Sequence, residues 1–266
     1  MIHPTAVIHP KAQIHPTVRV GPYAVIDEHV LVGPHCVIGP HVFLTGLTTI
    51  GEGNHFYAGC VVGEAPQDLK YKGEATRLQI GDQNTIREHV TINRSTHLGH
   101  CTTIGSHNQL MAHCHLAHDV SIGDHVTLVN GCLLAGHVTV GDRAVISGNC
   151  LVHQFVRIGT LAMMQGGSAI SKDLPPYTMA CGDNHLCGLN TVGLRRAGFS
   201  SEQRLELRRL YHALFRSGRN LRAAVASAKE EFSSEPARAF LEFVASTKRG
   251  ICGDAGGGTG ATESED

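Results

Sequence analysis

The chain has 266 residues and a formal net charge of −1. This near-neutral balance gives no electrostatic reason to expect a nucleic acid or an anionic membrane as a partner. The opening residues, MIHPTAVIHP, lack the basic and apolar segments of a signal peptide, and no stretch is apolar enough for a bilayer span. We therefore expect a cytoplasmic protein of one large or two modest domains, with no integral membrane segment.

A large apolar residue recurs at every sixth position from Ile2 to Val62 and again, on the same count, from Ile80 to Ile170. A period of six is typical of a hexapeptide-repeat β-helix, a prism whose walls are short parallel strands. The fifth position of each hexad is small or polar, which suits a second inward side chain. Three hexads make one coil, so residues three hexads apart should stack at ~4.8 Å. The rule for parallel crossovers alone favours a right-handed coil.

The nine cysteines fit this pattern better than they fit a disulfide framework. Five of them occupy the small inward position of their hexads: Cys36, Cys60, Cys114, Cys132 and Cys150. A free cysteine at such a position behaves as a small hydrophobic residue. Without an export signal, a reducing compartment is the expected environment.

Residues 63–79 interrupt the pattern, because Asp68 and Glu74 fall where apolar residues are expected. Val62 and Ile80 are three hexads apart, so this insertion is expected to replace one coil without breaking register. A long polar loop that leaves a regular solenoid is usually functional.

Beyond this loop the coils are expected to run unbroken to Ile170, with Leu98 as one of the inward residues. Pro175 and Pro176 then remove two ladder donors and end the prism. The predicted β-helix therefore covers residues 1–176.

Residues 177–250 are predicted to form a helical C-terminal domain. Ser200 or Ser201 can cap the first clear amphipathic helix, and Ser234, followed by a proline, can begin the last. Residues 251–266 lack apolar periodicity and are predicted to be a disordered tail.

The stretch 194–222 carries eight basic residues against two acidic ones, an excess of six. Such a patch can attract an acidic partner. A solvated helix face is the alternative explanation. The basic residues are Arg195, Arg196, Arg204, Arg208, Arg209, Arg216, Arg219 and Arg222.

Most of the 19 histidines need no functional explanation, and many of them occupy the outward fourth position of a hexad. The spacing of one coil instead predicts a strip along one edge of the prism that combines imidazoles, an amide and a glycine. A strip of this kind could bind a polar substrate and supply a general base, because the histidine pKa lies near neutrality. The strip contains His100, His118, Gly136, His137, His153 and Gln154.

A zinc site is the competing explanation. The pair His113 and His118 has the spacing of two zinc ligands in β-helix carbonic anhydrases, but the third ligand would fall on Arg77. The ligand set is incomplete, so no metal is expected.

Six segments of the sequence together resemble the UDP-N-acetylglucosamine O-acyltransferase family that begins lipid A synthesis. They are GEAPQDLKYKGEATRLQIGD (63–82), IREHVTINRST (86–96), HLAHDVSIGD (115–124), LAGHVTVGD (134–142), VHQFVRIG (152–159) and KDLPPY (172–177). The segments GLRRAGFS and LFRSG extend the resemblance into the helices, so it covers about residues 1–250.

The resemblance implies a left-handed parallel β-helix followed by helices, assembled as a homotrimer with active sites between neighbouring subunits. It implies transfer of a 3-hydroxyacyl chain from acyl carrier protein to the 3-hydroxyl of UDP-N-acetylglucosamine. No cofactor is implied beyond the 4′-phosphopantetheine arm that carries the acyl chain.

By resemblance, His118 is the general base and the backbone N–H of Gly136 faces the developing oxyanion. Asp119 would orient the base, which requires a corner between these adjacent residues that the sequence does not show. Gly166 matches the residue that sets acyl-chain length. The implied substrate-binding residues are Gln67, Asp68, Lys70, His115, His137, His153, Gln154, Asn190 and Arg196.

Two positions depart from the family pattern. Val192 and Ala197 stand where an acidic and a basic side chain are often found. The sequence therefore does not predict which residues bind the nucleotide phosphates. A 3-amino sugar is an alternative acceptor, and its product would be an amide.

Overall fold

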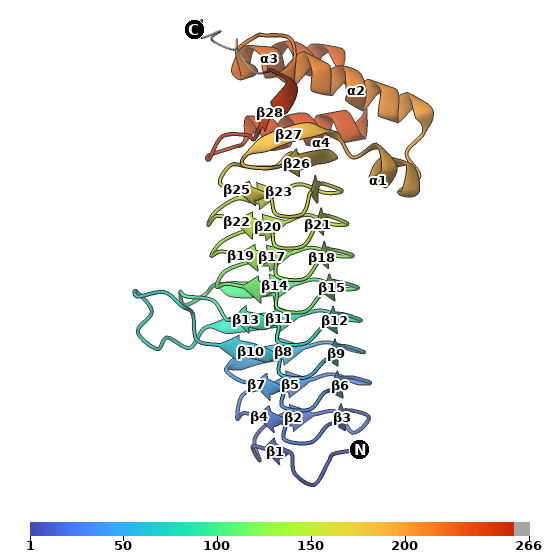
Figure 1. The fold of residues 1–266 in the computed structure, drawn as a ribbon. Helices are drawn as coiled ribbons and strands as arrows, with labels where there is room; N and C mark the ends of the chain where they lie inside the picture. The colour runs from blue at the N-terminus through green and yellow to red at the C-terminus, as the bar shows by residue number, and fades with distance from the viewer. Residues whose placement is uncertain (258–266) are drawn as a thin grey trace, which may run out of the picture.

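The chain is a triangular prism of stacked coils with helices at its C-terminal end (Figure 1). A computed structural model describes residues 1–257. The prism is a left-handed parallel β-helix, as the family resemblance implies, so the right-handed crossover expectation is wrong. That rule depends on the twist of longer strands, whereas most strands here are only two residues long.

Three parallel sheets form the walls of the prism. The first sheet contains β1 (Val7–Ile8), β4 (Val25–Ile26), β7 (Phe43–Leu44), β10 (Val61–Glu64), β13 (Thr91–Asn93), β16 (His115–Leu116), β19 (Leu133–Leu134), β22 (Leu151–Val152) and β25 (Ala169–Ile170). The second contains β2 (Gln13–Ile14), β5 (Leu31–Val32), β8 (Leu47–Ile50), β11 (Arg77–Ile80), β14 (Cys101–Ile104), β17 (Ser121–Ile122), β20 (Thr139–Val140) and β23 (Arg157–Ile158). The third begins with β3 (Arg19–Val20), β6 (Val37–Ile38), β9 (His55–Phe56), β12 (Thr85–Ile86), β15 (Gln109–Leu110), β18 (Thr127–Leu128), β21 (Val145–Ile146) and β24 (Met163–Met164).

The two inward rows predicted from the hexads form the core of the prism. Large residues such as Phe56 and Leu116 are buried, and so are the small ones such as Ala24 and Ala144. The five cysteines at small inward positions are free and buried. Burial of this continuous apolar column is the main stabilising term for coils that have little structure of their own.

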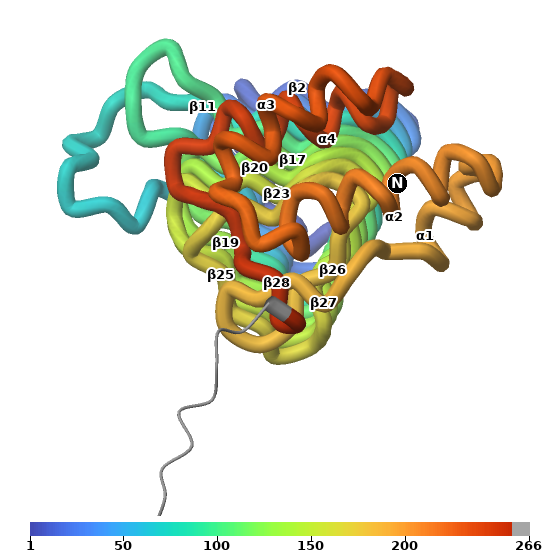
Figure 2. Tube along the Cα trace, turned by 90° about the horizontal axis from the view of Figure 1, so that it is seen from above, coloured from blue at the N-terminus to red at the C-terminus, as the bar shows by residue number. Residues whose placement is uncertain are grey.

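Two insertions change the register that the sequence predicted. Ile50 pairs with Ile80, five hexads further along the chain instead of three, so loop 63–79 lengthens a coil by two hexads and does not replace one. Ile92 pairs with Leu116, four hexads further along, which reveals a second loop, residues 94–100 between β13 and β14, that adds one hexad. Leu98 lies in that second loop and is 67% exposed, so the prediction of unbroken coils and an inward Leu98 is wrong. Both loops leave the prism on the same side (Figure 2).

The region after the prolines starts with strands, contrary to the prediction of a helical domain from residue 177. Strands β26 (Thr178–Cys181) and β27 (His185–Leu189) form an antiparallel hairpin that extends the third sheet. Ala180 and Leu186 on this hairpin are buried, so it closes the end of the apolar column. The six-residue periodicity ends before this hairpin, so it could not predict the hairpin.

Four helices follow: α1 (Thr191–Arg196), α2 (Ser201–Phe215), α3 (Leu221–Glu231) and α4 (Glu235–Ala245). Ser200 caps α2 in a reciprocal capping box with Gln203, and Ser234 caps α4, as their positions predicted. No helix in residues 1–257 is long and apolar enough to cross a membrane.

The predicted disordered tail is ordered in its first part. β28 (Gly253–Asp254) pairs with β27, Cys252 is buried, and a short turn of 3₁₀ helix, η1 (Ala255–Gly257), follows. A strand of two residues is too short to show a periodic pattern in the sequence. The rest of the predicted tail, 258–266, lies outside the described residues.

Candidate functional site

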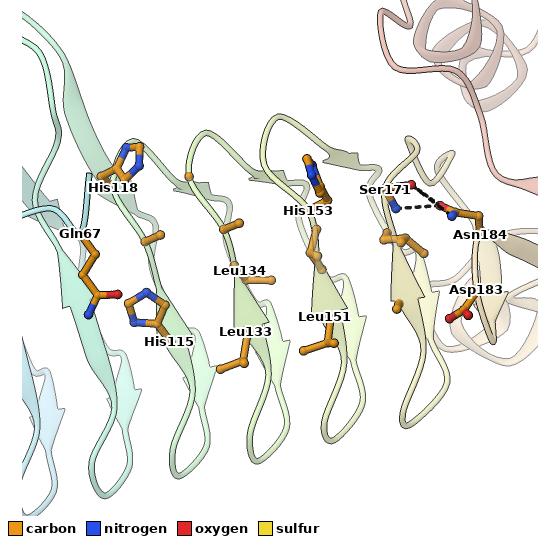
Figure 3. A pocket seen from close by; sticks show the side chains of 16 residues that line it. Gln67, His115, His118, Leu133, Leu134, Leu151, His153, Ser171, Asp183 and Asn184 are labelled. Carbon is orange, nitrogen blue, oxygen red and sulfur yellow. Dashed lines mark hydrogen bonds between the residues drawn. The ribbon is translucent and has the colours of Figure 1, made fainter. Parts of the chain in front are cut away.

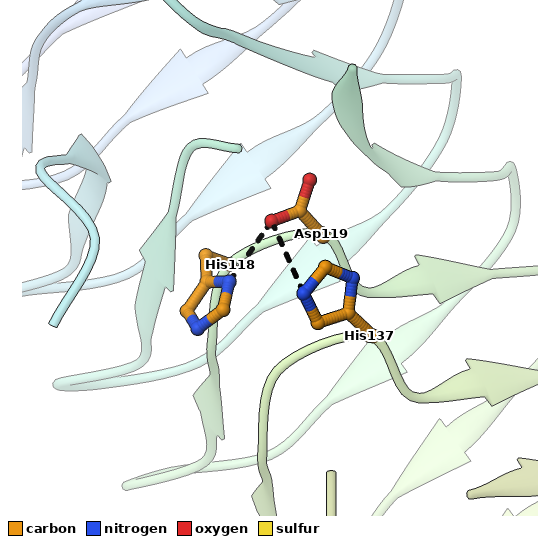
Figure 4. Close-up of side chains that lie close together, drawn as sticks. All are labelled: His118, Asp119 and His137. Atoms are coloured by element: carbon orange, nitrogen blue, oxygen red, sulfur yellow. Dashed lines mark hydrogen bonds and ion pairs between the residues drawn. The ribbon is translucent and has the colours of Figure 1, made fainter. Parts of the chain in front are cut away.

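The site lies on the edge where the first and second sheets meet. After β16 the chain turns at His118 and Asp119, and Asp119 has a φ of 58°. This left-handed residue supplies the corner that the sequence did not show. It lets the two adjacent side chains meet, with His118 Nδ1 only 2.9 Å from Asp119 Oδ2 (Figure 4).

The second loop holds the Asp119 carboxylate. The Ser95 hydroxyl donates to Oδ1, while the Thr96 backbone N–H and hydroxyl donate to Oδ2 at 3.1 and 2.8 Å. His100 Nδ1 lies 3.5 Å from Oδ1. Although burial disfavours the charged form, hydrogen bonds from Ser95, His118 and Thr96 outweigh it and hold the pKa of Asp119 well below its usual range.

This network assigns the proton on His118. An ionised Asp119 can only accept, so His118 Nδ1 must carry the hydrogen that it donates. The Thr96 hydroxyl lies 2.7 Å from the same Nδ1 and gives its own proton to Asp119, so it also accepts from Nδ1. In the neutral imidazole Nε2 is therefore the nitrogen without a proton, and it can act as a base.

Gly136 lies one coil above His118, and the base needs a glycine there. A Cβ at position 136 would come 2.5 Å from His118 Cε1 and 2.6 Å from Nε2. Among residues 1–257, the Gly136 N–H has no hydrogen-bond acceptor. A free N–H next to a basic nitrogen can stabilise an oxyanion that forms beside it.

Loop 63–79 supplies a third group to the base. Asp68 Oδ2 lies 4.0 Å from His118 Nε2, and the Lys70 N–H donates to Asp68 Oδ1 at 2.9 Å. That hydrogen bond, more than any other cause, lowers the pKa of Asp68. Both carboxylates near His118 are therefore charged at neutral pH, and they favour the imidazolium that forms when the base takes a proton.

An open groove of about 670 Å³ runs from His118 along the first sheet toward the helices (Figure 3). Its floor is the row of outward residues on successive strands: His115, Leu133, Leu151 and Ala169. Leu133 and Leu151 remain 44% and 49% exposed. Gln67 stands at the His118 end, and Asp183 with Asn184 stands at the other. An apolar row with polar ends suits an extended hydrocarbon chain.

The structure brings most of the predicted strip together. His115 lines the groove and its Nδ1 lies 2.7 Å from Thr91 Oγ1; burial lowers the pKa of His115. His137 Nε2 is 3.8 Å from Asp119 Oδ2, and its ring stacks on Phe155 at 4.4 Å. His153 also lines the groove, while Gln154 is exposed beside it.

Asn190, Arg196 and Gly166 lie away from the groove and from the edge that carries His118. The Asn190 side chain caps α1 by accepting from the Gly193 N–H, and it donates to the Leu161 carbonyl. Asn190 is only 6% exposed, so the structure gives it an internal role. Arg196 is exposed at the end of α1, and Gly166 lies on the opposite edge of the first sheet from His118.

Sequence reasoning missed Ser95, Thr96 and the leucine floor of the groove. Because the second loop adds one hexad, Ser95 and Thr96 lie beside Asp119. A regular coil of three hexads would place them at another position on the prism. The sequence could have predicted the leucine floor, because Leu133 and Leu151 are one coil apart at an outward position, where a polar residue is expected.

His118, Asp119 and His137 also offer three atoms close enough together to hold a metal ion. A metal on His118 Nδ1 would have to displace the proton that Asp119 and Thr96 accept, so we expect the site to work without one. We expect EDTA to leave activity unchanged and elemental analysis to find no stoichiometric metal. One zinc per subunit, lost together with activity, would contradict this assignment.

The prism and this site define the class of hexapeptide-repeat transferases. Residues 11–46 and 101–136 match the family described as bacterial transferase hexapeptide (six repeats). Residues 173–252 match the second domain of UDP-N-acetylglucosamine O-acyltransferase.

Individual relatives indicate one family within this class. The chain is 46% identical over 211 residues to an acyl-[acyl-carrier-protein]–UDP-N-acetylglucosamine O-acyltransferase of Anaeromyxobacter sp. (strain Fw109-5), covering 78% of this chain and 82% of that one. It is 45% identical to the enzyme of that name from Thermodesulfovibrio yellowstonii, over 79% and 83% of the two chains.

Solved structures agree with these relatives. LpxA from Bacteroides fragilis, a UDP-N-acetylglucosamine acyltransferase, superposes with a TM-score of 0.91 at 41% identity, over 94% of this chain and 99% of that one. The Francisella novicida UDP-N-acetylglucosamine acyltransferase gives 0.92 at 34% identity over the full length of both. The chain belongs to the acyl-[acyl-carrier-protein]–UDP-N-acetylglucosamine O-acyltransferase family and is an acyltransferase.

Proposed function

We propose that this enzyme transfers a 3-hydroxyacyl chain from acyl carrier protein to the 3-hydroxyl of UDP-N-acetylglucosamine, as the first step of lipid A synthesis in the cytoplasm. The observation that carries the proposal is the position of His118 Nε2, the ring nitrogen that faces away from Asp119, beside the free Gly136 N–H at the start of an apolar groove. A base, an oxyanion donor and an acyl site are the parts that this reaction needs.

In the proposed mechanism, His118 Nε2 takes the proton of the sugar 3-hydroxyl. The hydroxyl oxygen attacks the thioester carbonyl carbon at the same time. The carbonyl oxygen becomes an oxyanion and accepts from the Gly136 N–H. The carbon–sulfur bond then breaks, and the imidazolium returns its proton to the leaving thiolate. Asp119 stays ionised throughout and stabilises the imidazolium through Nδ1.

We propose that the active enzyme is a homotrimer in which a second copy completes the groove. Beyond Thr91, the outward row of the first sheet continues toward the N-terminus as Val61, Phe43, Val25 and Val7, an apolar face that water disfavours. Arg196 and Gly166 lie away from His118 in one chain, so their proposed contacts with the substrate require a neighbouring subunit.

A direct assay tests the reaction. The purified protein is incubated with UDP-N-acetylglucosamine and 3-hydroxyacyl carrier proteins, and the products are identified by mass. The proposal predicts one added acyl group in an ester that mild base removes. A base-stable product formed only from a 3-amino sugar would instead favour the amide alternative that Val192 and Ala197 leave open. No product from either acceptor would contradict both.

The carrier protein is proposed to dock on the basic stretch 194–222. Arg195, Arg204 and Arg208 line a cleft of about 420 Å³ between α1 and α2. We expect Arg204→Glu with Arg208→Glu to raise KM for the acidic carrier several-fold and to flatten its salt dependence. Arg238→Glu, an exposed change on α4, is the matched control. Equal carrier kinetics in both variants would show that the stretch is a solvated face.

Gly166 is proposed to set chain length. In the proposed trimer, Gly166 of one subunit faces the groove of a neighbouring subunit and leaves it open. The enzyme should then prefer long 3-hydroxyacyl chains, and Gly166→Met should shift preference to shorter ones. Each buried methylene contributes about 0.8 kcal/mol, so two to four of them change the rate ratio by tens to hundreds of fold. A Cβ at Gly166 meets its nearest atom at 3.5 Å, so folding should survive. An unchanged ratio in the folded variant would exclude this role.

A further inference from the structure

A second cleft lies on the opposite flank of the edge that carries His118. It has a volume of about 500 Å³ and contains His137, whose Nε2 is 3.8 Å from Asp119. Its walls come from β20, β23 and the segment between α4 and β28. The lining residues are His137, Thr139, Phe155, Arg157, Asp173, Ser246, Lys248 and Arg249.

Charge in this cleft is not balanced. The Arg157 guanidinium donates to Asp173 Oδ2 from Nε at 2.9 Å and from Nη2 at 2.8 Å, so these two charges cancel. Arg157 also donates to the Ser246 hydroxyl and to the Phe243 carbonyl, which leaves it no free nitrogen. Arg157 and Asp173 therefore form the rigid, neutral floor of the cleft.

Lys248 and Arg249 supply the unbalanced charge. Neither has a carboxylate partner among residues 1–257. Arg249 is held in place by Nε, which donates to the Ser171 carbonyl at 2.9 Å, and by Nη2, which donates to His153 Nδ1 at 3.2 Å. Its Nη1 and the Lys248 ammonium have no acceptor within the described chain. Two free cations on a fixed floor suit an anion better than a neutral ligand.

We propose that this cleft binds a phosphate group of a substrate, with Lys248 and Arg249 as its ligands. The inference rests on the proposed function, in which both substrates carry phosphate: a diphosphate in the nucleotide sugar and a phosphodiester in the carrier's pantetheine arm. Phe155, which is half exposed, lines the same cleft, and its ring stacks on His137. Anion binding here would fix the substrate on the far side of the base from the acyl groove.

Steady-state kinetics of Lys248→Ala and Arg249→Ala test the proposal. Each lost charge-assisted contact should raise one KM about tenfold or more, with kcat nearly unchanged. A rise in KM for UDP-N-acetylglucosamine assigns the cleft to the diphosphate, and a rise for the acyl carrier assigns it to the pantetheine phosphate. Lys229→Ala, an exposed lysine on α3, is the matched control. If neither KM moves in the Lys248 and Arg249 variants, the proposal is wrong.

A binding measurement separates this proposal from the reaction itself. Calorimetry with inorganic pyrophosphate should show binding to the wild-type protein that weakens about tenfold in Lys248→Ala. The Lys248 ammonium has no acceptor among residues 1–257, so its loss should not disturb folding. Wild-type protein that binds pyrophosphate in this way but transfers no acyl group would refute the function and keep the site. Equal pyrophosphate affinity in the variant would refute the site alone.

Discussion

His118→Ala is expected to lower turnover by about 10²–10⁴-fold, because it removes the nitrogen that accepts the proton of the attacking hydroxyl. Asp119, Thr96 and Gly136 remain in place, so UDP-N-acetylglucosamine should still bind. The substitution removes the imidazole ring beside Gly136 but no large apolar side chain from the core. Steady-state rates and calorimetric affinities for the sugar nucleotide, measured side by side, give the comparison.

His125→Ala is the matched control for this result. His125 stacks on His107 at 4.9 Å on another edge of the prism, away from the groove. The control removes the same imidazole without touching the site, so its turnover should equal that of the wild type. Wild-type turnover in His118→Ala, or an equal loss in His125→Ala, would contradict the assignment of the base.

Gly136→Ala is expected to lower turnover by about 10²-fold while the protein stays folded. The added Cβ would lie 2.5–2.6 Å from the His118 ring, so the imidazole must move. Displacing a catalytic group by about 1 Å is enough for a loss of that size. The φ of Gly136 is not in the left-handed region, so the backbone itself accepts alanine. The loss should appear in kcat, with little change in the melting temperature.

Gly253→Ala separates this effect from a general cost of removing a glycine. A Cβ at Gly253 meets nothing within 4 Å, so that variant should keep full activity. Unchanged kcat in Gly136→Ala would show that the imidazole can move without consequence. The close approach of Gly136 to His118 would then have no catalytic meaning.

The sequence predicted the prism well because burial repeats with a fixed period. Every coil must place large and small residues inside in alternation, so positions such as Phe56 and Cys132 could be assigned without a structure. Where the chain leaves the prism, no such constraint operates. The length of the first loop, the existence of the second loop and the hairpin β26–β27 therefore did not follow from the pattern.

The site was predictable to the same extent. His118 and Gly136 could be placed on one edge because they are three hexads apart. The contact between His118 and Asp119 depends on a left-handed corner, and the hydrogen bonds from Ser95 and Thr96 depend on the second loop. Local backbone geometry and loop length are not encoded by periodicity, so the proton on His118 could be assigned only from the structure.

A crystal structure of the wild-type enzyme with UDP-N-acetylglucosamine would show directly whether His118 faces the reacting hydroxyl. We expect the sugar 3-hydroxyl to lie within about 2.6–3.2 Å of His118 Nε2, at the start of the leucine-lined groove. Asp119 should still hold Nδ1 on the other side of the ring. A sugar bound away from this edge, or one whose 3-hydroxyl faces no nitrogen of His118, would contradict this expectation.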